Sequence, residues 1–442
     1  MSGVFKAYDI RGRTDTGELT PELAQAVGAA FARLAKAPRI AVGRDCRASS
    51  PALADALMAG ITEQGTSVFD LGEVATDMIY FVSGTKQVPG AVVTASHNPS
   101  EYNGIKLCRE GAAPVGEDSG LAEIEQMVRA GLDPGPGGGT IEQLDLREGY
   151  INHLLSVVEP EKMTALRVAV DGGNGMAGVV VEDVFARIPP SLLGLYLELD
   201  GTFPNHPADP LQPENLVDLI ALVEAEATDL GVAFDGDADR AFFIDDRGKP
   251  LSGSTTTALI ARWFLARRPG ATIVHNLITS RAVPETITAH GGTPIRTRVG
   301  HSFIKKVMAD TGAVFGGEHS GHYYFADNFR ADSGMLAMLV LLQVISEAGR
   351  PLSELRTEVE PYASSGEVNL RVADQAGAVE RVEASFPDAE LDRQDGLTVS
   401  WPDRWFNIRS SNTEPVLRLN VEGPDQAAVT DLVQRVRQVV GA

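Results

Sequence analysis

The sequence predicts an α/β protein in which three similar mixed α/β domains and a smaller C-terminal α+β domain surround a central cleft. The chain has 442 residues, which is too many for one ordinary hydrophobic core. A strand, a polar loop, a helix and a second strand recur three times in this order. From about Tyr362 the pattern changes to alternating strands followed by a helix, which is typical of an α+β domain.

The three recurring units place their polar loops at the same point, the carboxyl end of the first strand. Ligands of α/β sheets tend to bind at this edge, so three such loops would face one cleft. The units share no residue-level identity, and their wide spacing indicates repeated domains rather than a solenoid. In the first unit the first strand, the helix and the second strand are Arg39–Asp45, Pro51–Gln64 and Thr66–Gly72. In the second unit the strand and its loop are Leu166–Gly175, the helix is Val179–Arg187 and the second strand is Leu193–Leu199. In the third unit the strand and its loop are Ala271–Ser280, the helix is Ala282–His290 and the second strand is Thr293–Gly300.

The last region predicts the strands EVNLRV, LTVSW, FNIRSS and VLRLNVE and then one helix, Gln426–Val440. We expect domains at residues 1–148, 149–248, 249–358 and 359–442. The longest near-continuous apolar run, Met335–Ile345, is much shorter than the roughly 20 residues of a membrane span, so it predicts a buried helix.

The composition is that of an acidic globular protein. A net charge of -22 gives the chain no general attraction for nucleic acid or anionic lipid, so any phosphate must be bound by local cations. Cys46 and Cys108 are the only cysteines, which fits a reducing compartment. The N-terminal MSGVFKAYDIRG lacks the apolar core of a signal peptide. We therefore expect a cytoplasmic protein that binds neither nucleic acid nor membranes.

The first candidate site is the segment TASHNPSEYNGIK, Thr94 to Lys106, which follows the predicted strand GAVV. We interpret it as one polar loop that presents Ser96 at the end of a strand, with Lys106 at the far end of the same loop. The alternative is ordinary turn chemistry, because Ser, Asn, Pro and Gly are common turn residues.

The second candidate site is AFDGDADRAFFID, in which Asp235, Asp237 and Asp239 alternate. In an extended backbone they would share one face, and three hard oxygen ligands suit Mg²⁺ or Ca²⁺. A solvated acidic turn is the alternative, but apolar residues flank the cluster and Arg240 follows it. An EF-hand is excluded because Arg240 stands where its glycine must be and AFFID predicts a strand.

Two further loops carry polar side chains. In GGEHSGHYYF, glycines flank Glu318, His319, Ser320 and His322, which favours a polar ligand loop over a zinc site because no helix can form there. RSSNTEP begins with Arg409 and predicts an anion pocket, since arginine offers a planar fork to phosphate. Each could also be a generic turn.

TASHNP, DGDADR, GEHSGH and RSSNTEP occur in this order, and YDIRG, with Arg11, precedes them. Together they resemble the α-D-phosphohexomutase superfamily. The resemblance covers essentially the whole chain, and each of the four motifs lies in a different predicted region. It implies three similar α/β domains and a smaller C-terminal domain that closes over the cleft.

The resemblance also implies a reaction. Ser96 would be a phosphoserine that donates its phosphoryl group to a sugar monophosphate, and a hexose 1,6-bisphosphate intermediate would return its other phosphoryl group. Mg²⁺ would be held by a phosphate oxygen on Ser96 together with the three aspartates. The catalytic residues implied are Ser96, His97, Lys106, Arg11, Arg240 and His322; the metal ligands are Ser96, Asp235, Asp237 and Asp239; and the substrate-binding residues are Glu318, Ser320, His301, Arg409, Ser411, Asn412 and Thr413.

The substrate implied is mannose 6-phosphate, interconverted with mannose 1-phosphate, because GEHSGHYYF looks most like bacterial phosphomannomutases. His319 departs from the methionine that many of them carry, and Ile278 stands near a position where dual-specificity members often place lysine. Phosphoglucomutase, dual-specificity and phosphoglucosamine mutase activities are therefore alternatives. Outside the mutases, a metal-dependent sugar phosphatase and a non-catalytic Ca²⁺- or sugar-binding protein remain open. We expect a monomer or a homodimer.

Overall fold

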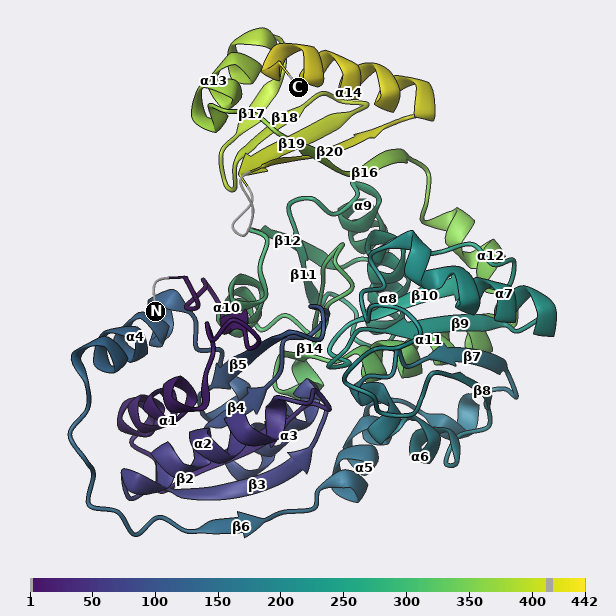
Figure 1. Cartoon of the computed structure of the whole chain (residues 1–442). Coiled ribbons are helices and arrows are strands. Elements are labelled where there is room, and N and C mark those ends of the chain that lie inside the picture. Colours follow the sequence, from purple (N-terminus) through teal and green to yellow (C-terminus); the bar gives the residue numbers. More distant parts are fainter. Residues whose placement is uncertain (1–2, 411–415, 442) are drawn as a thin grey trace.

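The computed structural model describes residues 3–410 and 416–441 of the chain, which form four sheets (Figure 1). The first three sheets are mixed or largely parallel and carry helices, and the fourth is antiparallel. The predicted fold class is therefore confirmed. Each recurring unit has the expected pair of parallel strands, because a helix carries the chain back along the sheet between them.

The first sheet has the strand order β1-β5-β4-β2-β3-β6. Strands β2, β3 and β4 run parallel, whereas β5 returns antiparallel to β4 and pairs Lys106 with Val92. The elements are β1 (Ile10–Arg13), α1 (Pro21–Ala35), β2 (Arg39–Arg44), α2 (Ser50–Glu63), β3 (Ser67–Glu73), α3 (Thr76–Lys86), β4 (Gly90–Val93), β5 (Tyr102–Cys108), α4 (Leu121–Ala130) and β6 (Ile141–Gln143).

The second sheet has the order β10-β9-β7-β8. The helix predicted at Val179–Arg187 is shorter than expected, because a 3₁₀ turn at Met176–Val179 precedes it. The elements are α5 (Arg147–Val157), β7 (Arg167–Asp171), α6 (Val181–Phe185), β8 (Ser191–Leu195), α7 (Val217–Glu226), β9 (Leu230–Phe234) and β10 (Ala241–Asp245).

The third sheet has the order β12-β11-β13-β14-β15. The apolar run at 335–345 lies in the buried helix α11, as predicted. The elements are α8 (Gly253–Arg267), β11 (Thr272–Asn276), α9 (Ala282–Ala289), β12 (Thr293–Thr297), α10 (His301–Thr311), β13 (Phe315–Gly317), β14 (Tyr323–Phe325), β15 (Ala331–Asp332), α11 (Gly334–Ala348) and α12 (Leu352–Leu355).

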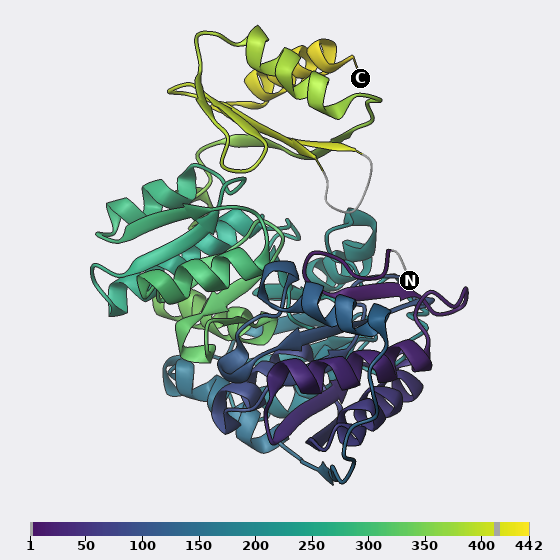
Figure 2. The same cartoon turned by 90° about the vertical axis from the view of Figure 1, so that its left-hand side faces the viewer.

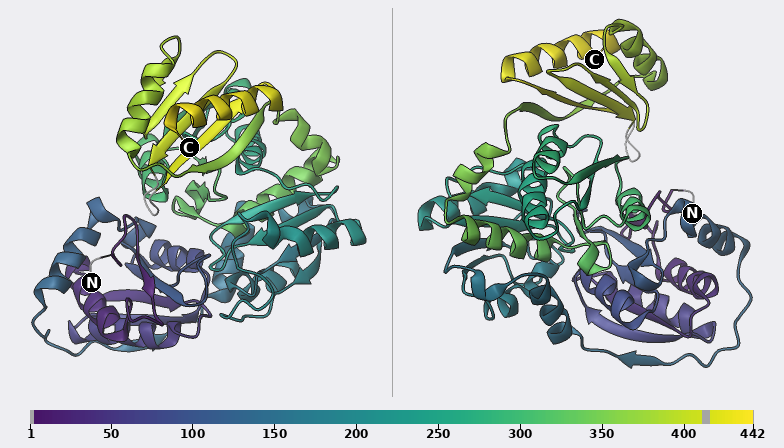
Figure 3. Two further views of the ribbon diagram at one scale, coloured as in Figure 1. Left: turned by 45° about the horizontal axis from the view of Figure 1, so that its top comes forward. Right: turned by 180° about the vertical axis from the view of Figure 1, so that it is seen from behind.

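The fourth sheet has the order β16-β20-β19-β18-β17 and lies beside the third domain (Figures 2 and 3). Two helices cover it, not the single predicted one: α14 has the predicted bounds, and α13 was missed. The elements are β16 (Ala363–Leu370), α13 (Gln375–Ser385), β17 (Glu390–Asp392), β18 (Leu397–Ser400), β19 (Trp405–Ser410), β20 (Leu417–Gly423) and α14 (Gln426–Val440).

The largest apolar cluster crosses domain borders, because it joins buried residues of α3, α5, α8 and α11. This cluster therefore joins the first three domains, although the first domain also has a core of its own, and the fourth domain has a separate core. In the part of the chain that the structure describes, no single helix is long and apolar enough to cross a membrane. Helix α11 and the helical residues 352–358 are long and apolar enough only when they are counted together, and the two are bent by 89° relative to each other.

Candidate active site

Ser96 lies directly beyond the buried strand β4, at the start of a polar turn. Its φ of 53° is left-handed, a conformation that costs free energy in a residue other than glycine. The turn is shorter than predicted, because β5 already begins at Tyr102 and Lys106 lies within that strand. Lys106 is therefore placed by the sheet and not by the end of a loop.

A buried arginine holds the Ser96 turn. The Arg47 guanidinium donates hydrogen bonds to the carbonyl oxygens of Ser96 (2.8 Å), Asn98 (2.7 Å), Pro99 (2.7 Å) and Tyr102 (3.3 Å). Its Nε also donates to Asp45 at 3.0 Å. These bonds satisfy polar backbone groups that the turn would otherwise bury unpaired, and they hold Ser96 in its left-handed conformation.

Asp235, Asp237 and Asp239 lie on a turn between β9 and β10, not on the extended backbone that we expected. Ala238 has a φ of 61°, which folds the turn so that one oxygen of each carboxylate lies within 4.8 Å of the others. All three side chains are buried. The carboxylates converge through a left-handed turn and not through strand alternation.

The Ser96 turn meets the aspartate turn through direct hydrogen bonds. Ser96 Oγ donates to Asp235 Oδ2 at 2.8 Å, and Arg240 Nε donates to the same oxygen at 2.9 Å. Arg240 Nη2 lies 3.3 Å from Ser96 Oγ and donates to His97 Nδ1 at 2.5 Å. Burial, together with Arg240 and Arg11, lowers the pKa of His97 well below its ordinary value. His97 is therefore a neutral acceptor here.

Lys106 bridges the other two carboxylates, with Nζ 2.6 Å from both Asp237 Oδ2 and Asp239 Oδ2. Although burial opposes it, these two carboxylates raise the pKa of Lys106, so the group is an ammonium. Burial alone would raise the pKa of Asp237, but Lys106 and a hydrogen bond from Thr76 lower it below its ordinary value. Burial raises the pKa of Asp235 to about 7, against the effect of Arg240.

The cluster fits Mg²⁺ by its remaining oxygens. Of all the described atoms, none forms a hydrogen bond with Asp237 Oδ1 or Asp239 Oδ1, although both oxygens are buried. Burying a carboxylate oxygen without a partner is costly, and hard oxygen ligands are those that Mg²⁺ prefers. Lys106 thus anchors one oxygen of Asp237 and one of Asp239 and leaves the other oxygen of each free for a cation, whereas both oxygens of Asp235 accept hydrogen bonds from Ser96 or Arg240.

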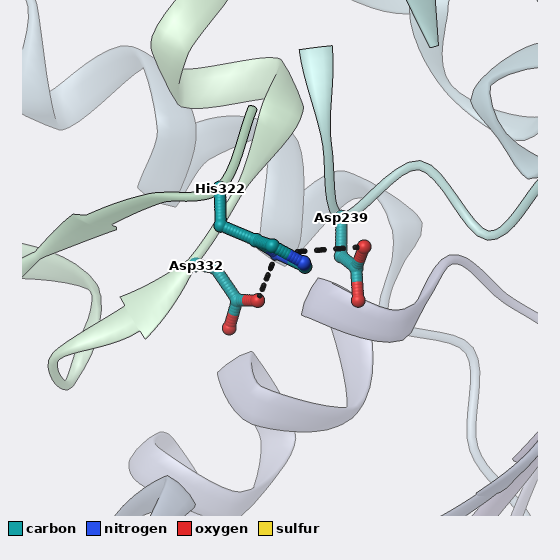
Figure 4. A group of neighbouring side chains, drawn as sticks. All are labelled: Asp239, His322 and Asp332. Atoms are coloured by element: carbon teal, nitrogen blue, oxygen red, sulfur yellow. Dashed lines mark hydrogen bonds and ion pairs between the residues drawn. The ribbon is translucent and has the colours of Figure 1, made fainter. Parts of the chain in front are cut away.

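His322 reaches the same cluster from the third domain (Figure 4). Its Nδ1 lies 2.9 Å from Asp332 Oδ2 and 3.9 Å from Asp239 Oδ1. Burial lowers the pKa of His322, but Asp239 and Asp332 outweigh it and raise the pKa above its ordinary value. The other oxygen of Asp332 lies 2.7 Å from the buried ammonium of Lys305. Asp332 thereby fixes the ring of His322 beside the aspartate turn.

The other predicted residues lie near by or outside the described part. Arg11 donates to Asn98 Oδ1 in the Ser96 turn at 2.5 Å. Glu318 is buried, and it accepts hydrogen bonds from Tyr324 (2.7 Å), Ser320 (3.2 Å) and Asn276 (3.3 Å). Arg409 Nη2 pairs with Glu367 at 3.1 Å. His301 begins α10, but its side chain lies outside the described part of the chain, as do Ser411, Asn412 and Thr413 entirely.

Each of the four domains matches a domain of known proteins. Models of phosphoglucomutase/phosphomannomutase match in order along the chain: α/β/α domain I at residues 2–133, domain II at 148–248, domain III at 252–362 and the C-terminal domain at 367–439. The chain belongs to the phosphoglucomutase/phosphomannomutase family. It is therefore a phosphohexomutase-family enzyme, as the four motifs predicted.

Relatives support the same assignment over almost the full length of the chain. A protein of Salmonella montevideo named phosphomannomutase is 42% identical over 430 residues, covering 95% of this chain and 94% of that protein. A Xanthomonas campestris protein named phosphohexose mutases is 40% identical and covers 97% and 96%. A crystal structure of a phosphoglucomutase/phosphomannomutase family protein from Burkholderia thailandensis has a TM-score of 0.89 and 32% identity, covering 99% and 97%.

Three residues of this candidate site were missed by reasoning from the sequence. Arg47 could have been noticed, since it follows the buried strand β2 by only a few residues. Thr76 gave no local signal, because the residue that it contacts lies 161 positions away. Asp332 lies in the acidic segment DSGM that follows GEHSGHYYF, but no role was given to it. Thr76 donates to Asp237, and Asp332 contacts His322.

Proposed function

We propose that this enzyme interconverts mannose 6-phosphate and mannose 1-phosphate by moving a phosphoryl group through Ser96. The observation that carries the proposal is the placement of Ser96 Oγ between Asp235 Oδ2, at 2.8 Å, and Arg240 Nη2, at 3.3 Å. A serine so placed can carry a phosphate beside a carboxylate cluster and a fixed positive charge. We assign the domains to residues 1–148, 149–248, 249–358 and 359–442.

In the first half-reaction the Ser96 Oγ–phosphorus bond breaks while a hydroxyl oxygen of the sugar monophosphate bonds to phosphorus. The hydroxyl proton goes to His322, whose Nδ1 side is held by Asp332 so that Nε2 is left as the basic nitrogen. Ser96 Oγ takes up a proton from the solvent as it leaves, and His322 returns the hydroxyl proton to the solvent, so that the half-reaction consumes no proton. Until then Arg240 Nη2 stabilises its negative charge.

The product of this half-reaction is hexose 1,6-bisphosphate, which also acts as the activator of unphosphorylated enzyme. After the sugar reorients, Ser96 Oγ attacks its other phosphoryl group and the steps run in reverse. Lys106 keeps its positive charge between Asp237 and Asp239, and Arg11 fixes the Ser96 turn through Asn98. Mg²⁺ held by Asp235, Asp237, Asp239 and a phosphate oxygen on Ser96 would offset the charge of the transferring phosphoryl group.

We assign the binding of the sugar phosphate to residues of the third and fourth domains. Glu318 and Ser320 would hold sugar hydroxyls, since a carboxylate can accept two such hydrogen bonds. Arg409, with Ser411, Asn412 and Thr413, would hold the phosphate that is not transferred, and His301 would face the ligand. The charges of Arg409 and Arg418 act on His319, whose pKa burial and these arginines lower to about 3.

We assign mannose as the sugar because the Salmonella montevideo relative is named phosphomannomutase. A second candidate, activity on several hexose phosphates, is favoured by the Xanthomonas campestris relative named phosphohexose mutases. Glucosamine phosphate is a weaker candidate. A sugar phosphatase would use the same residues but would release free phosphate.

A coupled assay tests the proposal with mannose 1-phosphate, glucose 1-phosphate and glucosamine 1-phosphate side by side, with Mg²⁺ and a catalytic amount of hexose 1,6-bisphosphate. We expect the fastest conversion with mannose 1-phosphate and no release of inorganic phosphate. Intact mass should show one phosphoryl group, which is absent from Ser96→Ala. The matched control is Ser100→Ala, an exposed serine of the same turn, which should keep both the activity and the phosphoryl group. Conversion of none of the three sugars overturns the proposal.

A further inference from the structure

Helix α3 of the first domain begins against the aspartate turn of the second domain. Its first residue, Thr76, is buried and makes two hydrogen bonds to one residue, Asp237. The backbone N–H of Thr76 donates to the Asp237 carbonyl oxygen at 3.0 Å, and its hydroxyl donates to Asp237 Oδ2 at 2.5 Å. Residues 161 positions apart are thus joined at a turn that has a left-handed residue, Ala238, at its centre.

The two oxygens of Asp237 have different surroundings. Oδ2 accepts from both Thr76 Oγ1 and Lys106 Nζ, at 2.5 and 2.6 Å. Oδ1 is buried and accepts no hydrogen bond from any residue that the structure describes. Two donors from the first domain therefore fix the rotation of the carboxylate and leave one specified oxygen free.

We propose that Thr76 is a positioning residue for the metal site: its hydroxyl holds Asp237 so that Oδ1, and not Oδ2, is presented to Mg²⁺. The inference rests on the Mg²⁺ site of the proposed function and adds a residue that the motifs do not contain. Carboxylates that bind metals are commonly held by such hydrogen bonds, and loss of one typically weakens metal affinity about 10- to 100-fold.

Lys106 alone cannot do this. Its ammonium is shared between Asp237 Oδ2 and Asp239 Oδ2, so it fixes the distance between the two carboxylates but leaves each free to turn about that contact. Thr76 adds a second donor to Asp237 and binds its backbone as well. The alternative is that Thr76 only fills the interface between the two domains, in which case its methyl group matters and its hydroxyl does not.

The test is the affinity for Mg²⁺ itself, measured by isothermal titration calorimetry on full-length, chelator-treated protein without substrate. Thr76→Val keeps the shape of the side chain and removes the hydroxyl, and we expect its dissociation constant to rise about 10- to 100-fold. Thr76→Ser keeps the hydroxyl, and we expect it to bind like the unsubstituted protein. The matched control is Thr66→Val, a buried threonine of the same domain whose hydroxyl donates to Ala37 O at 3.3 Å.

The outcomes separate this inference from the proposed function. If Thr76→Val binds Mg²⁺ as tightly as the unsubstituted protein, Thr76 is an interface residue and the inference is overturned. If Thr76→Val does not fold, Thr76→Ala and Thr76→Ser are compared in its place, and equal affinities overturn the inference. If the unsubstituted protein binds no Mg²⁺, the metal site of the proposed function fails first, and the positioning role fails with it.

Discussion

The Ser96 hydroxyl donates a 2.8 Å hydrogen bond to Asp235 Oδ2, across 139 residues of sequence and between the first two domains. The bond requires a hydrogen on Ser96 Oγ, so it exists only while the serine carries no phosphate. Phosphorylation would break it and place a dianion beside a buried carboxylate. The two forms of Ser96 should therefore differ in how strongly the aspartate turn attracts a cation.

We predict that Mg²⁺ binds the phosphorylated enzyme about tenfold or more tightly than the unphosphorylated enzyme, since phosphate adds a charge of roughly -1.5 to -2 at neutral pH. Calorimetric titration of the two forms, prepared with hexose bisphosphate or with phosphatase, measures the difference. Ser96→Ala should bind like the unphosphorylated form after either treatment. Equal affinities of the two forms would exclude a phosphate oxygen as a metal ligand.

Arg240 should be essential to both stability and turnover. It donates to Asp235 and contacts Ser96 Oγ, and its side chain is 4% exposed. Arg240→Met leaves Asp235 buried without its positively charged partner, which we expect to lower the free energy of unfolding by about 3–5 kcal/mol. The substitution also removes the positive charge that lies beside the leaving oxygen, Ser96 Oγ, so kcat should fall about 10²- to 10³-fold.

Arg240→Lys is the matched variant for this prediction. It keeps the charge but not the planar fork, so it should recover most of the stability and only part of kcat. Thermal unfolding and the coupled assay measure the two effects. Normal kcat in a folded Arg240→Met protein would contradict the role given to Arg240.

Arg47 should control the rigidity of the Ser96 turn. A lysine offers a single ammonium in place of the guanidinium, and so cannot reach all four carbonyl oxygens that Arg47 binds. Each buried carbonyl left unpaired costs about 1–3 kcal/mol, so Arg47→Lys should lower the melting temperature and speed amide exchange at residues 94–102. Arg44→Lys, which changes a partly exposed arginine at the end of β2, three residues before Arg47, is the control and should change neither.

Asp77 makes stability depend on pH. Its carboxyl is buried between Tyr150 and Ser333, and burial raises its pKa from 3.8 to about 7, against the hydrogen bonds from these two hydroxyls. The unfolded chain releases this proton near pH 4, whereas the folded chain keeps it until about pH 7. A group with a raised pKa stabilises most at low pH, so its contribution is lost as the pH rises through this range.

Asp77→Asn cannot ionise and should not show this loss. The melting temperature of the variant, relative to that of the unsubstituted protein, should therefore rise steadily between about pH 4 and 7 and be constant above this range. The exposed Asp55→Asn serves as the control. A relative melting temperature that does not change with pH would show that Asp77 is ionised in the folded protein throughout.

Much of the fold was predictable because its signals are local. The apolar run at 335–345 is a buried helix, and the residues predicted for the C-terminal helix are those of α14. The prediction of a strand at AFFID, which excluded an EF-hand, is also confirmed by β10. Helix α13 was missed because its buried face is narrow: only Ala378 and Val382 are buried in it, too few to give a clear helical period.

The sequence by itself determined which chemical groups follow the strands: a serine after β4, three carboxylates after β9, and a glutamate and two histidines in the β13–β14 turn. Side-chain type and strand pattern are read from neighbouring residues, so these assignments needed no tertiary contact. Only the tertiary structure decided how the groups face one another. Thr76, Lys106 and Arg47 act on turns that are 49 to 161 residues away, and hydrogen bonds over such separations leave no local signal in the sequence.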